Sequence, residues 1–197
     1  MGIRIISSIC VYLMTVLPSA SLHGQGDNCS YVFNGIDLQT KQYLIEVAPE
    51  SFFNYTPPEI KNDLQEENLI QCRGQIVKAD DQASLHLNIQ INSLKAQEYY
   101  GTIDAGYILK VIFLDEQELS LKCAAGSKGV MPRNQKNYIY PVGYKLSSRE
   151  IRMLSKKEID KIGIQWSSGY EEYPIYEIDF LMNQVLCLNQ AEQQKPN

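Results

Sequence analysis

Histidine is scarce in this sequence, and its scarcity limits the catalytic and metal-binding chemistry available to the chain. The two histidines are His23, close to the N-terminus, and His86. No two cysteines have the C-x-x-C spacing that is typical of zinc sites. A Ser-His-Asp or Cys-His catalytic site in the body of the chain would have to use His86. We therefore expect no metal site and no cofactor, and we interpret His86 as a solvated side chain on the polar side of a strand.

Runs of basic residues are also missing, which argues against nucleic acid as a partner. The formal net charge is -5, and the densest basic spot, Lys156-Lys157, is followed directly by an acid. Nucleic-acid-binding proteins neutralise phosphates with clustered Lys and Arg side chains. The segment 126–129 contains two glycines around a lysine, but its spacing differs from that of a P-loop. The sequence thus excludes nucleic acid and disfavours anionic membrane surfaces as partners.

No apolar run is long enough for a transmembrane helix, but a shorter one stands near the N-terminus. Arg4 precedes a mainly apolar run of 13 residues, Ile5 to Leu17, whereas a bilayer span needs about 20. Small residues follow this run, as in a secretory signal peptide. We expect residues 1–24 to be such a peptide, cleaved between Ala20 and Gln25. The mature protein would then be secreted or periplasmic, without a transmembrane anchor.

Four cysteines follow the predicted leader, and an even number in an exported chain suggests two disulfides. They are Cys29, Cys72, Cys123 and Cys187. Cys29 and Cys187 bracket the predicted domain, and the ends of a domain often lie close together. Cys72 and Cys123 each lie on the apolar side of a predicted strand. We favour the pairs Cys29–Cys187 and Cys72–Cys123, and the alternative is a set of buried free thiols.

Most of the chain after the leader has the pattern of short β-strands. Apolar and polar residues alternate from Leu85 to Ile91, which is typical of a half-buried strand. Apart from Lys110, the run 107–114 is apolar on both faces, and a turn at 115–117 leads into another alternating strand. Many short strands separated by turns are typical of antiparallel sandwiches and barrels. We therefore predict a mainly β (α+β) fold, an antiparallel β-sandwich or barrel-like sheet.

Two segments indicate helices in this mainly β chain. Ser147 to Glu150 fits a capping box, which predicts a short helix near 147–158. Later, apolar residues recur at helical spacing and predict an amphipathic helix near 177–189. The polar end, 191–197, is expected to be a disordered tail. Residues 25–190 would then form a single β-rich domain.

Four stretches of the sequence carry a resemblance to known exported proteins. They are 144–154 (YKLSSREIRML), 159–166 (IDKIGIQW), 168–170 (SGY) and 179–184 (DFLMNQ). Their order and character resemble small secreted proteins of uncharacterised families from bacteria of the Bacteroidota type. The resemblance implies a secreted β-rich protein and assigns no catalytic residue.

Tyrosine is abundant, with 13 residues, and several tyrosines gather late in the chain around the single tryptophan. Tyrosine and tryptophan combine a rigid apolar surface with a polar tip, which suits a binding surface for a peptide or a glycan. Alternatively, tyrosine is simply a good strand former in a half-buried sheet. The candidate ligand-binding residues are Tyr138, Tyr140, Tyr144, Trp166, Tyr170 and Tyr173.

Adjacent carboxylates at 80–81, 115–116 and 171–172 lie beside predicted turns. Such pairs are usually solvated, but two convergent carboxylates can hydrolyse glycosidic bonds. Our leading hypothesis is a secreted or periplasmic, non-enzymatic β-rich domain with a binding or envelope-associated role. Its partner would be a peptide, a glycan or another secreted protein. The alternatives are a secreted hydrolase that uses paired carboxylates on loops, and a small inhibitor or immunity-like partner of another secreted protein.

Overall fold

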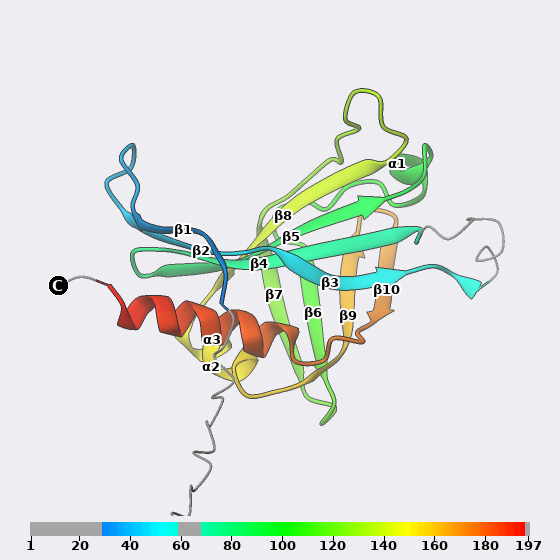
Figure 1. The fold of residues 1–197 in the computed structure, drawn as a ribbon. Coiled ribbons are helices and arrows are strands. Elements are labelled where there is room, and N and C mark those ends of the chain that lie inside the picture. The colour runs from blue at the N-terminus through cyan, green and yellow to red at the C-terminus, as the bar shows by residue number, and fades with distance from the viewer. Residues whose placement is uncertain (1–28, 59–67, 196–197) are drawn as a thin grey trace, which may run out of the picture.

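A computed structural model of the chain describes residues 29–58 and 68–195, which contain ten strands and three helices (Figure 1). The predicted signal peptide lies outside the described residues. The strands are β1 (Tyr31–Ile36), β2 (Tyr43–Val47), β3 (Glu50–Tyr55), β4 (Ile70–Ala79), β5 (Gln82–Ile91), β6 (Ile108–Phe113), β7 (Glu118–Ala125), β8 (Tyr138–Leu146), β9 (Ile159–Trp166) and β10 (Gly169–Pro174). The helices are α1 (Ala96–Tyr99), α2 (Ser148–Leu154) and α3 (Phe180–Gln193).

All ten strands belong to one antiparallel sheet with the order β1-β2-β4-β5-β8-β7-β6-β9-β10. Strands β2 and β3 pair with the same edge of β4, one after the other: β2 pairs with residues 77–79 and β3 with residues 70–74. Figure 1 shows β4, β5 and β8 running across β6, β7 and β9, so the sheet folds over on itself. The predicted mainly β fold is confirmed, and the sheet remains open rather than closing into a barrel.

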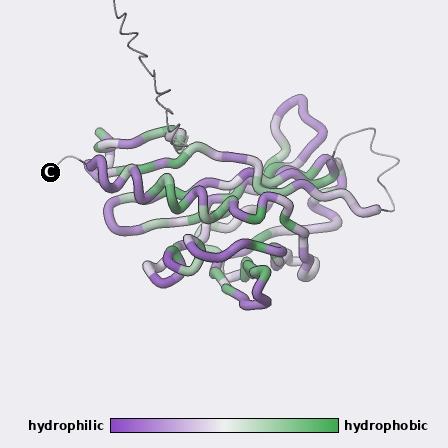
Figure 2. Tube along the Cα trace, turned by 60° about the horizontal axis from the view of Figure 1, so that its bottom comes forward, coloured by the Kyte–Doolittle hydropathy of each residue, from purple (hydrophilic) through white to green (hydrophobic). Residues whose placement is uncertain are grey.

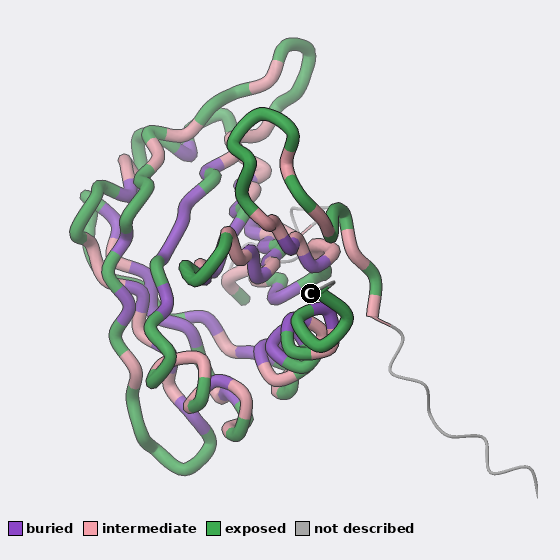
Figure 3. Tube along the Cα trace, turned by 90° about the vertical axis from the view of Figure 1, so that its left-hand side faces the viewer, coloured by how far each residue is buried: buried purple, intermediate pink, exposed green. Residues whose placement is uncertain are grey.

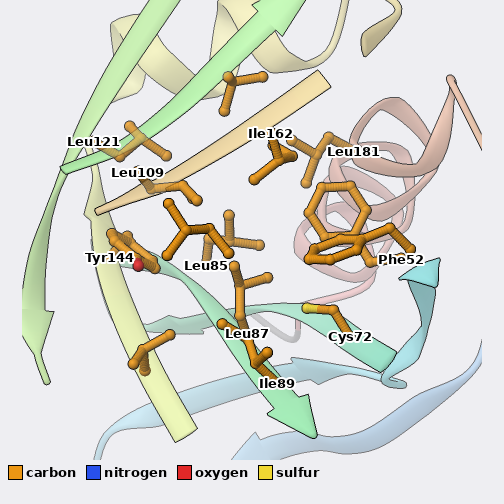
Figure 4. Packing of buried hydrophobic residues seen from close by; sticks show 14 of the residues in the cluster. Phe52, Cys72, Leu85, Leu87, Ile89, Leu109, Leu121, Tyr144, Ile162 and Leu181 are labelled. Atoms are coloured by element: carbon orange, nitrogen blue, oxygen red, sulfur yellow. The ribbon is translucent and has the colours of Figure 1, made fainter. Parts of the chain in front are cut away.

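The hydrophobic core fills the space inside the folded sheet. Leu85, Leu87 and Ile89 of β5 are buried there together with Leu109 of β6 and Ile162 of β9 (Figure 4). The residues that alternate with them on β5 face the other way and are mostly exposed. Figure 3 shows buried residues along the strands and exposed residues at the hairpin tips. The alternation predicted for this strand is therefore confirmed, with its apolar set in the core.

Helix α3 covers one open side of the folded sheet, where it packs on β2 and β4. Hydrophobic and hydrophilic residues alternate along it (Figure 2), and its buried set includes Phe180 and Leu181. The Phe180 ring stacks on Phe52 of β3 with the ring centroids 4.4 Å apart. The predicted C-terminal helix is confirmed, but it continues to Gln193. Because Ala191 is fully buried, the expectation of a disordered tail from residue 191 is wrong for residues 191–193.

One of the two expected disulfides is present. Cys29, just before β1, is bonded to Cys187 of α3, with the Cα atoms 5.3 Å apart. Cys72 and Cys123 are buried free thiols, so the expected pairing between them is wrong. Strands β5 and β8 lie between their strands in the sheet, and Cys72 is opposite Ile89 of β5 whereas Cys123 is opposite Tyr144 of β8, so the two cysteines are not neighbours in the register. A disulfide requires Cα atoms within about 7 Å.

Helix α2 begins with the predicted capping box. The Ser147 hydroxyl accepts a hydrogen bond from the Glu150 backbone N–H, and the Glu150 carboxylate accepts one from the Ser147 N–H at 2.5 Å. These bonds satisfy N–H groups that a helix start otherwise leaves unpaired. The short helix expected near 147–158 is therefore confirmed, with the bounds 148–154.

Replacing the cap should destabilise the protein modestly. We expect Ser147→Ala to lower the free energy of unfolding by about 1 kcal/mol, because the Glu150 N–H loses its side-chain acceptor. Urea unfolding followed by circular dichroism measures this change. Ser148→Ala, one residue into the same helix, is the matched control and should be nearly neutral. Equal losses in the two variants would contradict a specific role for the cap.

Candidate functional site

The six aromatic residues predicted to bind a ligand do not form an exposed surface. Tyr140, Tyr144, Trp166 and Tyr173 are at most 2% exposed and belong to the core. Of the remaining two, Tyr138 is half-buried and Tyr170 is 45% exposed. The three tyrosines of β8 do share one face, as parity predicts, but this face points into the fold. The prediction of an aromatic binding face is therefore wrong, because the second half of the sheet covers these side chains.

These aromatic side chains instead hold two edges of the sheet together. Trp166 contacts Tyr140 edge-to-face at 5.3 Å, and its indole N–H donates to the Tyr173 hydroxyl at 3.2 Å. Tyr173 of β10 stacks on Phe53 of β3 at 5.2 Å and donates to the Glu171 carboxylate at 2.7 Å. Burial, followed by the nearby Glu171 charge, raises the pKa of Tyr173. The tyrosine-rich strands thus serve packing at the seam between β3 and β10.

The predicted carboxylate pairs do not converge on a common site. The pair 80–81 lies at the turn between β4 and β5, and the pair 115–116 at the turn between β6 and β7. Glu171 and Glu172 point to opposite faces of β10, since the first accepts from buried Tyr173 and the second from an exposed tyrosine. Two-carboxylate hydrolysis needs both groups on one substrate bond. None of the three pairs offers that arrangement.

A polar array lies on the outer face of β4 and β5, opposite the core. The strand register places Arg73 beside Asn88 and Gln75 beside His86. All four alternate with buried residues, so their side chains point outward. Neighbouring positions in such an array lie about 5 Å apart across strands and about 7 Å apart along one strand. Four hydrogen-bonding side chains from two strands are thereby brought within reach of one small molecule.

Small residues beside this array leave a hollow. On β8, Pro141 is opposite Asn88 and Gly143 is opposite His86, and Ala125 of β7 is paired with Gly143. Because these side chains are short, the surface falls away beside the polar array into a pocket of about 410 Å³. We call it the outer-face pocket, and its volume lies within the range that small-molecule sites occupy.

The backbone is interrupted at the same place. Strand β7 has a bulge between Cys123 and Ala125 where it pairs with β8. Further along β8, Ile139 forms a bridge with Val130, and Pro141, which has no N–H to donate, lies between these two pairings. Bulges are frequent next to functional sites because they redirect side chains and end strand pairing. The outer-face pocket therefore lies where the β7–β8 ladder is broken.

His86 is an exposed side chain on the outer face, and its neutral imidazole can both donate and accept a hydrogen bond. Burial lowers the pKa of His86, and the Glu46 charge opposes this effect. The Ser84 hydroxyl lies 2.9 Å from His86 Nε2, but Ser84 does not line the outer-face pocket. Within the described residues, no carboxylate is hydrogen-bonded to His86. A Ser-His-acid catalytic arrangement facing the pocket is therefore not assembled.

Arg73 is the one charged side chain among the described residues that line the outer-face pocket. Its Nη2 donates to the Pro49 carbonyl at 2.6 Å, which holds the guanidinium beside the link between β2 and β3. No carboxylate pairs with Arg73 anywhere in ranges 29–58 and 68–195. The sequence pattern singled out His86 but not Arg73, Gln75 and Asn88 as candidate site residues. Alternation along each strand predicts that these side chains point outward. That they lie beside one another depends on the pairing register of β4 with β5, which the sequence pattern does not show.

In the part of the chain that the structure describes, no three His, Cys, Asp or Glu side chains gather as metal ligands would. Its three helices are too short or too polar to cross a bilayer. No protein-family model, no curated protein and no solved structure matches the chain. Inference about function therefore depends on the geometry of the outer-face pocket.

Proposed function

We propose that the protein is a secreted or periplasmic, non-enzymatic binding domain that takes its ligand in the outer-face pocket. The observation that carries this proposal is the array of Arg73, Gln75, His86 and Asn88 beside a floor of small residues. Such a site offers directional hydrogen bonds at its wall and apolar contact at its floor, as ligand pockets do. Its size suits a small molecule or the end of a peptide or glycan chain.

Binding is favoured over hydrolysis by how the polar groups are arranged. The pocket wall consists of neutral donors and acceptors with a single cation, and none of the predicted carboxylate pairs lines it. Cleavage of a glycosidic bond would need two carboxyl groups within several ångströms of the same atom. A hydrogen-bonding wall without such groups can recognise and orient a ligand.

An exported location is supported by the Cys29–Cys187 disulfide. Disulfides form and persist in oxidising compartments, and they are rare in the cytosol. The expected signal peptide provides the route to such a compartment. We infer that the ligand is met outside the cytosol, in the periplasm or the medium.

Filling the pocket should abolish binding without harming the fold. A Cβ at Gly143 would lie 3.6 Å from Ala125 Cβ and 3.7 Å from His86 Cδ2, which are ordinary contacts. We therefore expect Gly143→Ile to fold and to block the floor of the pocket. The measurement is screening of a library of charged and neutral fragments by protein-observed NMR on the exported, disulfide-bonded protein. We expect shifts at the amides of Arg73 and His86 that Gly143→Ile removes.

The matched control is Lys145→Ile, on the same face of β8 but outside the pocket. It introduces the same side chain into the same strand and should leave fragment binding unchanged. The proposal fails if no fragment shifts the pocket amides. It also fails if fragments that shift these amides bind Gly143→Ile as tightly as the unaltered protein.

A further inference from the structure

We infer that the outer-face pocket is selective for ligands that carry a carboxylate, which Arg73 binds. This inference rests on the proposed function and names the chemical class of the ligand. It follows from the charge of the pocket wall, the position of the guanidinium and the groups that surround it.

The charge of the pocket favours a negatively charged group. Its only formal charge is the guanidinium of Arg73, and neither Asp nor Glu is among the described residues that line it. Glu50, an exposed acid that follows Pro49 and is paired with Gly74, is the nearest acid in the strand register, and no salt bridge joins it to Arg73 in the described structure. A second acid, Glu46, lies on the outer face, where it is paired with Val77. Val77 is four residues from Arg73 along β4, a rise of about 13 Å. Within the described residues, no salt bridge therefore neutralises the guanidinium, although the chain as a whole is acidic.

The guanidinium is held in place and retains free donors. One nitrogen, Nη2, donates to the Pro49 carbonyl, which restricts the long side chain to one end of the pocket. An arginine carries five N–H donors in a planar fork, and this fork matches the two oxygens of a carboxylate. A guanidinium that is already oriented loses less conformational freedom when a ligand binds. Arg73 is thus prepared for a planar anion.

The neighbours of Arg73 suit the rest of such a ligand. Asn88 lies directly across from Arg73, so its amide can donate to the same carboxylate. Pro141 lies across from Asn88 and offers an apolar surface to the body of the ligand. A single guanidinium balances one negative charge, which fits a carboxylate better than a phosphate dianion.

The test compares two probes of nearly equal shape, phenylacetate and its neutral amide, phenylacetamide. Both are titrated into the exported protein at pH 7, with amide shifts at the outer-face pocket as the readout. We expect phenylacetate to bind about tenfold more tightly than phenylacetamide, because only the carboxylate forms charge-assisted bonds with Arg73. Arg73→Gln should remove this preference, so that the two probes bind equally.

Two further measurements make the result specific. Lys145→Gln removes one positive charge from the same face outside the pocket and should leave the preference intact. Inorganic phosphate, titrated in the same way, should bind more weakly than phenylacetate. Preserved circular dichroism and thermal midpoint in Arg73→Gln would show that the fold is unchanged.

Several outcomes would overturn the inference. Equal binding of the two probes to the unaltered protein, or a preference that survives Arg73→Gln, would refute carboxylate selectivity. After either result, the proposed function would still hold, with a pocket that binds neutral ligands, provided that Gly143→Ile still blocks both probes. Tighter binding of phosphate would also refute it. If neither probe and no fragment shifts the pocket amides, the proposed function fails together with this inference.

Discussion

Removal of the disulfide by Cys29→Ser with Cys187→Ser is expected to lower the free energy of unfolding by about 4 kcal/mol. The bond joins residues 158 positions apart, and closing so long a loop strongly restricts the unfolded chain. It also ties the segment before β1 to α3, where the Tyr31 hydroxyl donates to the Cys187 carbonyl at 2.9 Å. Urea unfolding of the oxidised protein and of the double variant measures the difference.

Reduction provides the control for this prediction. Treating the unaltered protein with dithiothreitol should produce the same loss, because Cys72 and Cys123 are already thiols. Thiol titration of the denatured, unreduced mature chain should detect these two groups alone. Four reactive thiols per mature chain, or equal urea midpoints for the double variant and the oxidised protein, would contradict the prediction.

Gln184→Leu is expected to lower the free energy of unfolding by about 3 kcal/mol, although leucine is close to glutamine in size. Gln184 of α3 is 1% exposed and is the one buried polar or charged residue in the described core. Its Oε1 accepts from the Ile76 N–H at 3.0 Å, and its Nε2 donates to the Ala48 carbonyl at 3.3 Å. These backbone groups lie where β2 ends and β3 begins along β4, so neither has a strand partner there.

Leucine would leave the buried Ile76 N–H without a hydrogen bond, at a cost of about 1–3 kcal/mol, and would also remove the donor to the half-buried Ala48 carbonyl. The matched control is Gln193→Leu, at an exposed position of the same helix, which should change stability little. Urea unfolding of both variants is the measurement. A Gln184→Leu variant as stable as the unaltered protein would show that the strands shift to satisfy these groups themselves.

Structural features that depend on residues close together in the sequence were predicted correctly. The capping box before α2 depends on Ser147 and Glu150, three residues apart, and it was predicted correctly. The alternation along β5 was equally local, since successive strand residues face opposite sides. By contrast, the gap between β2 and β3 along β4 is bridged by Gln184, which lies more than a hundred positions from Ile76 in the sequence. No local pattern indicates it.

The aromatic residues show a different limit of sequence-based prediction. Parity correctly placed the tyrosines of β8 on one face, but parity does not say which face is buried. That depends on the folding of the sheet over itself, which brings Trp166 of β9 against Tyr140 and leaves both Tyr140 and Tyr144 buried. Apolar rings with a polar tip fit both a binding surface and a core. The decision between these two environments is tertiary.

By itself, the sequence determined that this is a mainly β protein with a capped short helix and an amphipathic C-terminal helix. It did so because strand and helix periodicity and capping act within a few residues. Only the tertiary structure decided which cysteines are bonded, and only it placed Arg73 and Asn88 beside His86 and the small residues of β8. Those neighbours come from separate strands, and their adjacency follows from the sheet order and register, which long-range pairing sets.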